Sequence, residues 1–259
     1  MKTATRTKFV IGNWKMNPTT VADATRLVLG IGKKFPRPKS TVMVAPSYLH
    51  LGEVKRVLKK PYRMCAQDVF PGEGGPHTGC VSARMLLAQG VTSSIVGHSE
   101  RRAQGETNDM VGEKTRALVA LGMMPIICVG ETDRDHHGKY YSYVEAEVRA
   151  ALLGVTKKQL ANIVIAYEPV WAISTGDGKG QTATAEHAHE MKLFIQKVLV
   201  ELYGRPAALA VPIIYGGSVN AENADDLMKN GAIDGFLVGG ASLKVDTFIS
   251  IIKTVEAYL

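Results

Sequence analysis

Short apolar segments alternate along the chain with longer amphipathic segments. Eight apolar segments occur, at Phe9–Gly12, Thr41–Ala45, Arg63–Gln67, Ser93–Gly97, Pro125–Val129, Asn162–Tyr167, Val211–Tyr215 and Gly235–Val238. Most of them are continuously apolar, as in Ile163–Ala166, and lack the alternation of a strand with one solvated face. Continuous apolar runs are typical of parallel strands that helices cover on both faces. We therefore predict eight buried parallel strands.

The segments between the apolar runs carry helical periodicity. One set of apolar residues is spaced by three or four positions and would share a helix face: Ala188, Met191, Ile195, Val198 and Leu202. The pattern also predicts helices over Tyr140–Leu153 and Val245–Leu259, and a capping box from Thr156 to Gln159 opens a short helix. Eight strand–helix alternations in 259 residues predict an α/β fold, a (β/α)8 barrel with residues 1–259 as one domain. An open doubly wound sheet is the alternative.

Composition and charge narrow the class of protein. Hydrophobic residues make up 46% and charged residues 21%, as in ordinary soluble proteins, and no apolar run approaches the 18 residues of a membrane span. Three widely spaced cysteines without a secretory signal (Cys65, Cys80 and Cys128) predict reduced thiols in the cytoplasm. The net charge is +7, but the cations are dispersed, and the densest run, Lys55–Lys60, is typical of a solvated helix end. We therefore expect no nucleic-acid partner; an anionic small substrate, or no specific partner, fits the charge.

Side chains that carry chemistry follow six of the eight apolar runs, where the active sites of such barrels form. They include Asn13, Lys15, Gln67, Asp68, His98, Glu100, Arg101, Glu168 and Ser218. Glycines after the last two runs, in Gly216–Ser218 and Gly239–Ser242, would let backbone N–H groups approach an anion closely. These two segments together favour a phosphate site, although tight turns would need the same glycines.

Each of the other candidates has a structural alternative. Lys15 suits a surface lysine, His98 a hydrogen-bonded core histidine, and Glu168 a rim carboxylate paired with an arginine such as Arg101. However, Glu168 follows a fully apolar run, and a partly desolvated carboxylate accepts a proton more readily. One acid, one imidazole and one lysine beside a phosphate site predict proton transfer on a phosphorylated carbonyl compound.

Five segments of the chain resemble the triosephosphate isomerase family. They are Val10–Asn17, Val96–Arg102, Ala166–Ile173, Tyr215–Val219 and Val238–Leu243. These matches occur in the family's order and span nearly the whole chain, so the combined resemblance is specific. It implies an enzyme of glycolysis and gluconeogenesis that interconverts D-glyceraldehyde 3-phosphate and dihydroxyacetone phosphate through an enediol. Another phosphate-binding barrel enzyme, or a catalytically weakened barrel protein, is the alternative.

The resemblance also implies roles for individual residues. Glu168 would be the base and His98 the neutral imidazole that polarises the carbonyl; the family is the standard example of this pairing, so these roles come from the resemblance. Lys15 would hold the substrate electrostatically, Asn13 would position it, and Glu100 would support both regions. The phosphate would be bound by Ser174, Ser218, Gly239 and Gly240. No metal and no organic cofactor is implied.

The resemblance further implies that the chain forms a homodimer, in which the loop Gln67–Gly79 contacts the partner chain. Its tip, Thr78 and Gly79, would reach the partner's site near Asn13 and Lys15, whereas a mobile surface loop is the alternative. The family commonly has glutamate after this tip, and here Cys80 stands in its place. A thiol thus replaces a carboxylate that could pair at the interface.

The lid that follows the sixth apolar run also departs from the family pattern. Ser174 occupies the position of a glycine whose backbone N–H would touch the phosphate, and Gly178–Gln181 makes the segment roughly four residues longer. A longer, glycine-rich lid loses more conformational entropy on closing, and closure expels water and protects the enediol. We expect slow closure to lower kcat and to increase elimination of phosphate from the intermediate.

Deletion of Gly178–Gln181 tests this expectation about the lid. The shortened lid should close more readily, so kcat should rise and the fraction of turnovers that release inorganic phosphate should fall. Stopped-flow closure kinetics and phosphate release measure the two effects. If neither changes, the extra residues pack stably and have no catalytic cost.

Overall fold

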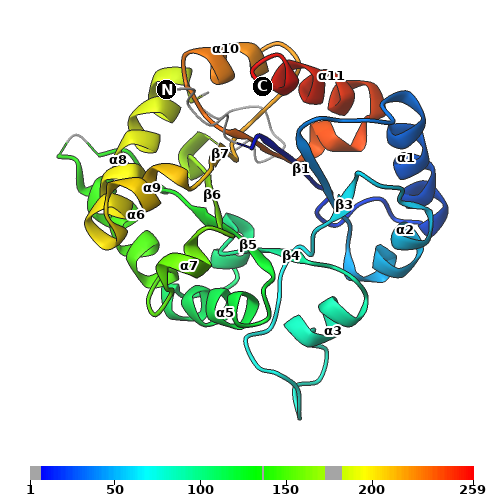
Figure 1. Cartoon of the computed structure of the whole chain (residues 1–259), viewed down its shortest axis with the longest axis horizontal. Helices are drawn as coiled ribbons and strands as arrows, with labels where there is room; N and C mark the ends of the chain where they lie inside the picture. The colour runs from blue at the N-terminus through cyan, green and yellow to red at the C-terminus, as the bar shows by residue number, and fades with distance from the viewer. Residues whose placement is uncertain (1–6, 136, 173–182) are drawn as a thin grey trace.

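The computed structural model describes residues 7–135, 137–172 and 183–259. Within them, one parallel sheet contains β1 (Phe9–Asn13), β2 (Thr41–Ala45), β3 (Arg63–Met64), β4 (Ser93–Val96), β5 (Met124–Val129), β6 (Val164–Tyr167), β7 (Ile213–Tyr215) and β8 (Gly235–Val238). The strand order is β3-β2-β1-β8-β7-β6-β5-β4, and a parallel bridge between Ala66 and Ser94 joins its two ends (Figure 1). The sheet is therefore a closed barrel, and the predicted fold class is confirmed.

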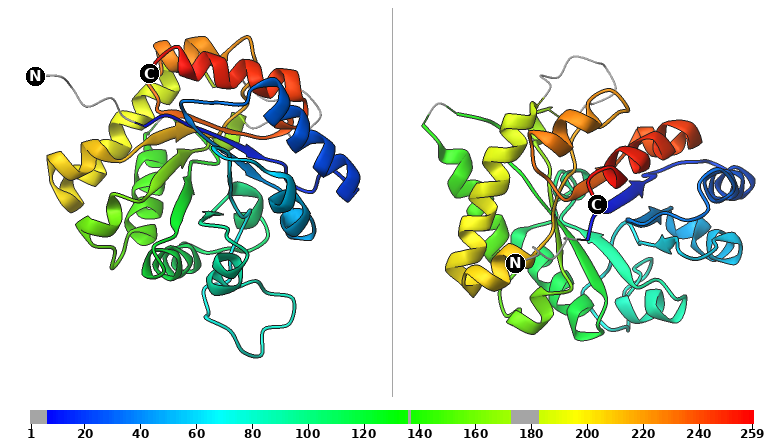
Figure 2. Two further views of the ribbon diagram at one scale, coloured as in Figure 1. Left: turned by 45° about the vertical axis from the view of Figure 1, so that its right-hand side comes forward. Right: turned by 45° about the horizontal axis from the view of Figure 1, so that its top comes forward.

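Helices surround the barrel on its outside (Figures 1 and 2). They are α1 (Val21–Lys34), α2 (Leu51–Val57), α3 (Ala83–Ala88), α4 (Ser99–Arg102), α5 (Asn108–Ala120), α6 (Lys139–Ala151), α7 (Lys157–Leu160), α8 (Ala185–Tyr203), α9 (Arg205–Ala210), α10 (Ala224–Lys229) and α11 (Val245–Glu256). Short 3-10 helices cover Tyr48–His50, Val170–Ala172 and Gly240–Leu243. The expected helices near Tyr140–Leu153 and Val245–Leu259 are confirmed as α6 and α11, and the capping box of Thr156 and Gln159 opens α7. In the part of the chain that the structure describes, no helix combines the length and apolar character of a membrane span.

The apolar residues form two separate clusters, one on each face of the sheet. The inner cluster fills the barrel with Phe9, Ile11, Met43, Ala45, Cys65, Ile95, Ile126, Cys128, Val164, Ala166, Ile214 and Leu237. The outer cluster joins alternate strand residues, such as Val10 and Ile165, to the buried faces of the helices. Burial on both faces explains why the strand segments are continuously apolar.

Several element boundaries differ from the sequence predictions. The third strand is shorter than Arg63–Gln67, because its pairing with β2 ends at the bond from the N–H of Cys65 to Val44, and Ala66 pairs only through an isolated bridge with Ser94. The sixth strand starts only at Val164, because the backbone N–H groups of Asn162 and Ile163 bond to the carbonyls of Gln159 and Leu160. The seventh starts after Pro212, because the N–H of Val211 still bonds to α9 and proline has no N–H for a ladder.

The predicted apolar face of α8 is correct except at its end. Ala188, Met191, Ile195 and Val198 are buried, whereas Leu202 is 37% exposed. Leu199 and Tyr203 occupy the buried side instead, because a 3.6-residue period moves the face around the helix. The basic run Lys55–Lys60 lies at the end of α2, and its four cations are exposed as predicted.

Candidate active site

Side-chain alternation along the strands determines which residues reach the interior of the barrel rim. The inner cluster includes Ile11, Ala166, Ile214 and Leu237, which lie near the ends of four strands. Side chains two positions apart in a strand point to the same face. The next inward positions are Asn13, Glu168, Gly216 and Gly239. Residues from four separate segments therefore meet at the carboxyl end of the barrel.

Glu168 lies at the centre of this group and is 1% exposed. Its backbone N–H bonds to the carbonyl of Val129 at 2.8 Å, which continues the strand pairing by one residue. Its Oε2 accepts a hydrogen bond from the backbone N–H of Ser99 at 2.9 Å, and its Oε1 lies 3.4 Å from Nε2 of His98. The alternative pairing with Arg101 does not occur, because Arg101 forms an ion pair with Asp68 at 3.1 Å. A buried acid thus faces an imidazole.

Two glycines provide the space that Glu168 occupies. A Cβ atom on Gly216 would lie 2.9 Å from Cγ of Glu168, and one on Gly130 would lie 1.7 Å from its carbonyl oxygen. Side chains at these positions would displace the carboxylate or its backbone. Sequence reasoning assigned Gly216 only to the phosphate site and did not identify Gly130.

His98 is held in a single orientation by the turn that follows β4. It is the N-cap of α4, and its Nδ1 accepts a hydrogen bond from the backbone N–H of Glu100 at 3.1 Å. A ring nitrogen that accepts this bond carries no proton, so the neutral ring carries its proton on Nε2. The Nε2–H donor faces Glu168 and the adjoining cavity. The geometry therefore supplies a neutral imidazole with its donor directed at the site.

Lys15 has a strained backbone, with a φ of +54°. Its N–H donates to Oδ1 of Asn13 at 3.0 Å, and its carbonyl accepts a bond from the side chain of Gln67 at 2.8 Å. This region of φ costs a residue other than glycine about 1–3 kcal/mol, and such strain is concentrated at functional sites. The Nζ atom lies 2.5 Å from Oε1 of Glu100, whose other oxygen is 3.9 Å from His98. Glu100 therefore connects the lysine with the imidazole.

The glycine segments after β7 and β8 line a cavity of about 270 Å³ beside these groups. Its lining includes Asn13, Lys15, His98, Gly216, Gly217, Ser218, Gly239 and Gly240. No atom lies within 4 Å of the position that a Cβ of Gly240 would occupy, so an anion can approach this backbone. The same position on Gly239 lies 3.9 Å from Nζ of Lys15. A cation and a glycine-rich backbone thus face one small cavity, which suits a phosphate group.

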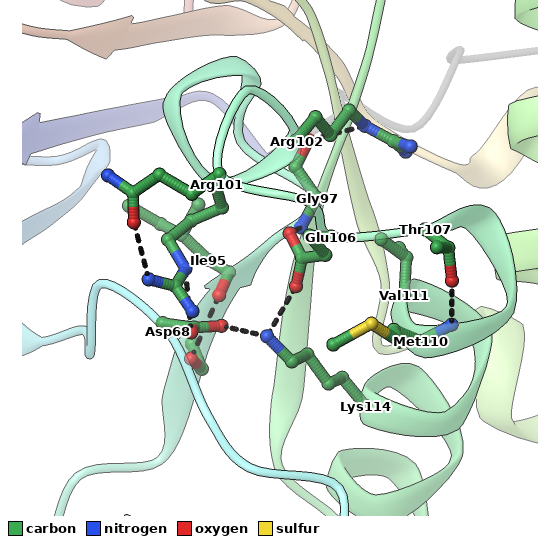
Figure 3. A network of polar contacts seen from close by, with 12 residues as sticks. Asp68, Ile95, Gly97, Arg101, Arg102, Glu106, Thr107, Met110, Val111 and Lys114 are labelled. Atoms are coloured by element: carbon green, nitrogen blue, oxygen red, sulfur yellow. Dashed lines mark hydrogen bonds and ion pairs between the residues drawn. The ribbon is translucent and has the colours of Figure 1, made fainter. Parts of the chain in front are cut away.

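A second polar network lies behind the turn that carries His98 (Figure 3). Lys114 is 3% exposed, and its Nζ contacts both Glu106 and Asp68. Oε2 of Glu106 accepts the N–H of Gly97, the residue before His98, at 3.1 Å. Sequence reasoning did not identify Lys114 or Glu106. One signal in the sequence could have identified Lys114: it shares the apolar face of α5 with Val111 and Leu118. A cation on a buried face needs a buried partner of opposite charge.

The remaining sequence candidates lie at the edge of the site or outside the described residues. Thr78 and Gly79 are exposed in the loop after β3. Ser174 and the added lid residues Gly178–Gln181 lie outside the described residues. No group of three or more histidine, cysteine, aspartate or glutamate side chains suited to a metal ion occurs among residues 7–135, 137–172 and 183–259.

The three cysteines have different environments. Burial raises the pKa of the Cys65 thiol to about 12, and burial followed by the nearby charge of Glu168 raises the pKa of Cys128 well above its usual value. Both thiols therefore stay protonated and unreactive near neutral pH. Cys80 is exposed beside the loop tip.

Comparison with known proteins identifies close relatives over almost the entire chain. A family model described as "Triosephosphate isomerase" matches residues 8–255. A triosephosphate isomerase of Roseiflexus sp. (strain RS-1) is 48% identical over 255 residues, which cover 95% of this chain and 97% of the relative. A triosephosphate isomerase of Thermoanaerobacter sp. (strain X514) is 42% identical over 251 residues, which cover 96% of this chain and 99% of the relative. A triosephosphate isomerase of Coprinopsis cinerea is 40% identical over 255 residues, which cover 98% of this chain and 100% of the relative.

Proposed function

The chain belongs to the triosephosphate isomerase family and interconverts D-glyceraldehyde 3-phosphate and dihydroxyacetone phosphate, and from that premise we propose how its residues perform this glycolytic reaction. The proposal rests on one observation. The buried carboxylate of Glu168 lies 3.4 Å from the only proton-bearing nitrogen of the neutral His98 ring, at the edge of a glycine-lined cavity that contains Lys15. Substrate phosphate would bind to the backbone of Gly239 and Gly240 together with Ser218, and Ser174 would add a fourth contact.

Glu168 would carry the proton between the two carbons. Its carboxylate takes a proton from C1 of dihydroxyacetone phosphate or from C2 of glyceraldehyde 3-phosphate, and the C–H electrons form the enediolate double bond. The Nε2–H of His98 and the ammonium of Lys15 stabilise the negative charge that moves to oxygen. Glu168 then returns its proton to the other carbon, and a proton moves between the two oxygens. Asn13 and Glu100 keep Lys15 and His98 in place through the contacts described above.

Glu168 must change its partner during this cycle. Its Oε2 accepts a hydrogen bond from the N–H of Ser99. Glu168 is not among the described residues that line the 270 Å³ cavity. A base must come within hydrogen-bond reach of the proton that it removes. We therefore propose that the carboxylate leaves Ser99 and turns toward the cavity when substrate binds.

Replacement of Glu168 by glutamine tests this assignment. The amide cannot accept the proton, so kcat should fall by about 10²–10⁴-fold, the usual contribution of general acid–base catalysis. Binding of a phosphate-bearing inhibitor should persist, because the phosphate site is built from other segments. Glu222→Gln, which removes an exposed charge after β7, is the matched control and should keep full activity. A Glu168→Gln enzyme with a kcat within about threefold of wild type would contradict the role.

We also propose that a second copy of the chain completes the site. Residues between β3 and α3 project away from the barrel (Figures 1 and 2), and this segment contains the exposed Thr78 and Gly79. A cavity of about 770 Å³ is lined by Asn13 and Lys15 and by this chain's own Gly79 and Cys80, and the partner's loop would enter it. Met16, 92% exposed at the edge of this cavity, provides apolar surface that a partner would cover.

Met16→Glu should weaken this homodimer, because it places a charge where the partner's loop would exclude water. The wild-type chain should sediment at twice its 27.9 kDa mass, and the variant should shift toward a single chain with lower turnover at low concentration. Leu193→Glu is the control, because it makes the same type of change at a 51% exposed leucine on α8, which lies away from the projecting loop (Figure 1). A wild-type protein that sediments as one chain would refute the dimer.

A cytoplasmic location is consistent with the thiols. None of the three cysteines forms a disulfide bond, as the redox environment of the cytosol would require. We therefore propose that the enzyme acts in the cytoplasm.

A further inference from the structure

We propose that Glu190 is a positioning residue for the isomerisation, holding the segment on both sides of Glu168 in place through Arg134 and Glu131. This inference rests on the proposed role of Glu168 as the base. Neither Glu190, which lies on α8, nor Arg134, which lies in the segment after β5, was a sequence candidate.

The first link is between Glu131 and the segment that contains Glu168. Oε1 of Glu131 accepts hydrogen bonds from the hydroxyl of Tyr167 at 2.8 Å and from Nε1 of Trp171 at 2.7 Å. The carbonyl of Glu131 accepts a third bond, from the N–H of Val170 at 3.1 Å. Tyr167 precedes Glu168, and Trp171 follows it by three positions. One residue thus fixes the chain before and after the proposed base.

The second link is the charge balance of Glu131, which is 1% exposed. A buried carboxylate is stable in its charged form only when it is paired. Nε of Arg134 lies 3.1 Å from Oε1 of Glu131 and supplies the cation. The same guanidinium lies over two aromatic rings, 4.7 Å from the centroid of Tyr140 and 5.7 Å from that of Trp171. Arg134 therefore stabilises Glu131 and also packs on the tryptophan that Glu131 binds.

The third link is Glu190, which fixes the far side of Arg134. Its Oε2 lies 3.1 Å from Nη2 of Arg134, and its Oε1 accepts hydrogen bonds from the hydroxyls of Tyr140 and Tyr141. The two tyrosine donors orient the carboxylate, and the carboxylate orients the fork of the guanidinium. A guanidinium held at both ends has one position over Trp171, whereas one held only by Glu131 has several.

This arrangement predicts an effect on turnover more than on binding. Three of the four proposed phosphate contacts, Ser218, Gly239 and Gly240, lie on the segments after β7 and β8, which the Glu190 network does not include. The Glu168 carboxylate, by contrast, must reach a carbon-bound proton, and small displacements of a catalytic group lower rates strongly. Loss of Glu190 should therefore lower kcat and leave KM nearly unchanged.

The test is Glu190→Gln measured in two backgrounds, wild type and Trp171→Phe. In the wild-type background we expect kcat to fall about tenfold, with KM changed by less than about twofold. In the Trp171→Phe background the same change should lower kcat by less than about threefold, because the residue through which Glu190 acts is already lost. Tyr141→Phe, which removes one of the contacts to Glu190, should produce a smaller loss in the same direction.

Glu201→Gln is the matched control, since it removes the same charge from the same helix and breaks an ion pair with Arg149. This control should keep the wild-type kcat. The inference fails if Glu190→Gln also keeps it, or if its loss in kcat is equal in both backgrounds, as a general loss of stability would produce. If Glu190→Gln does not fold, Tyr141→Phe in the same two backgrounds decides between these outcomes. Retained activity of Glu168→Gln would instead refute the base assignment, independently of Glu190.

Discussion

The site depends on one geometric constraint: parallel strands of a closed barrel end at a common rim, and their side chains alternate with a period of two. Ile11 and Ala166 point into the core of the barrel. Asn13 and Glu168 lie two residues further along the same two segments of the chain and therefore point to the same side. A shift of one residue in β6 would turn Glu168 toward the outer helices and bring Tyr167 inside. The core packing that fixes the register therefore also fixes the chemistry.

Within this frame, the protein keeps the side chain of Glu168 almost completely out of water. A buried carboxylate is costly, and two groups face this one: the N–H of Ser99 donates a hydrogen bond to its Oε2, and Nε2 of His98 lies 3.4 Å from its Oε1. The first belongs to the backbone of a helix N-terminus, so it remains available when the carboxylate leaves and returns. The second is the group that would polarise the substrate. His98 thus faces the carboxylate at rest and would face the substrate during turnover, so this donor need not reorganise.

Much of this could be predicted from the sequence, because the relevant signals are local. The eight strands follow from continuous apolar runs, and Asn13, Lys15, His98 and Glu168 could be located from the ends of these runs. The positive φ of Lys15 and the space beside Gly130 could not be predicted, because they arise from neighbours distant in sequence. The same limitation applies to the buried pairs, since Arg101 binds Asp68 although Glu168 was an equally plausible partner from sequence alone.

The central claim is that Glu168 carries a proton between two carbons of the substrate. The most direct measurement is the isomerisation of dihydroxyacetone phosphate in D₂O, with the product examined by NMR. A proton held on a carboxylate exchanges with solvent, so the account predicts glyceraldehyde 3-phosphate that carries deuterium on C2. The Glu168→Gln enzyme should introduce no deuterium at C2, and a Glu168→Gln enzyme that still does so at the wild-type rate would contradict the account.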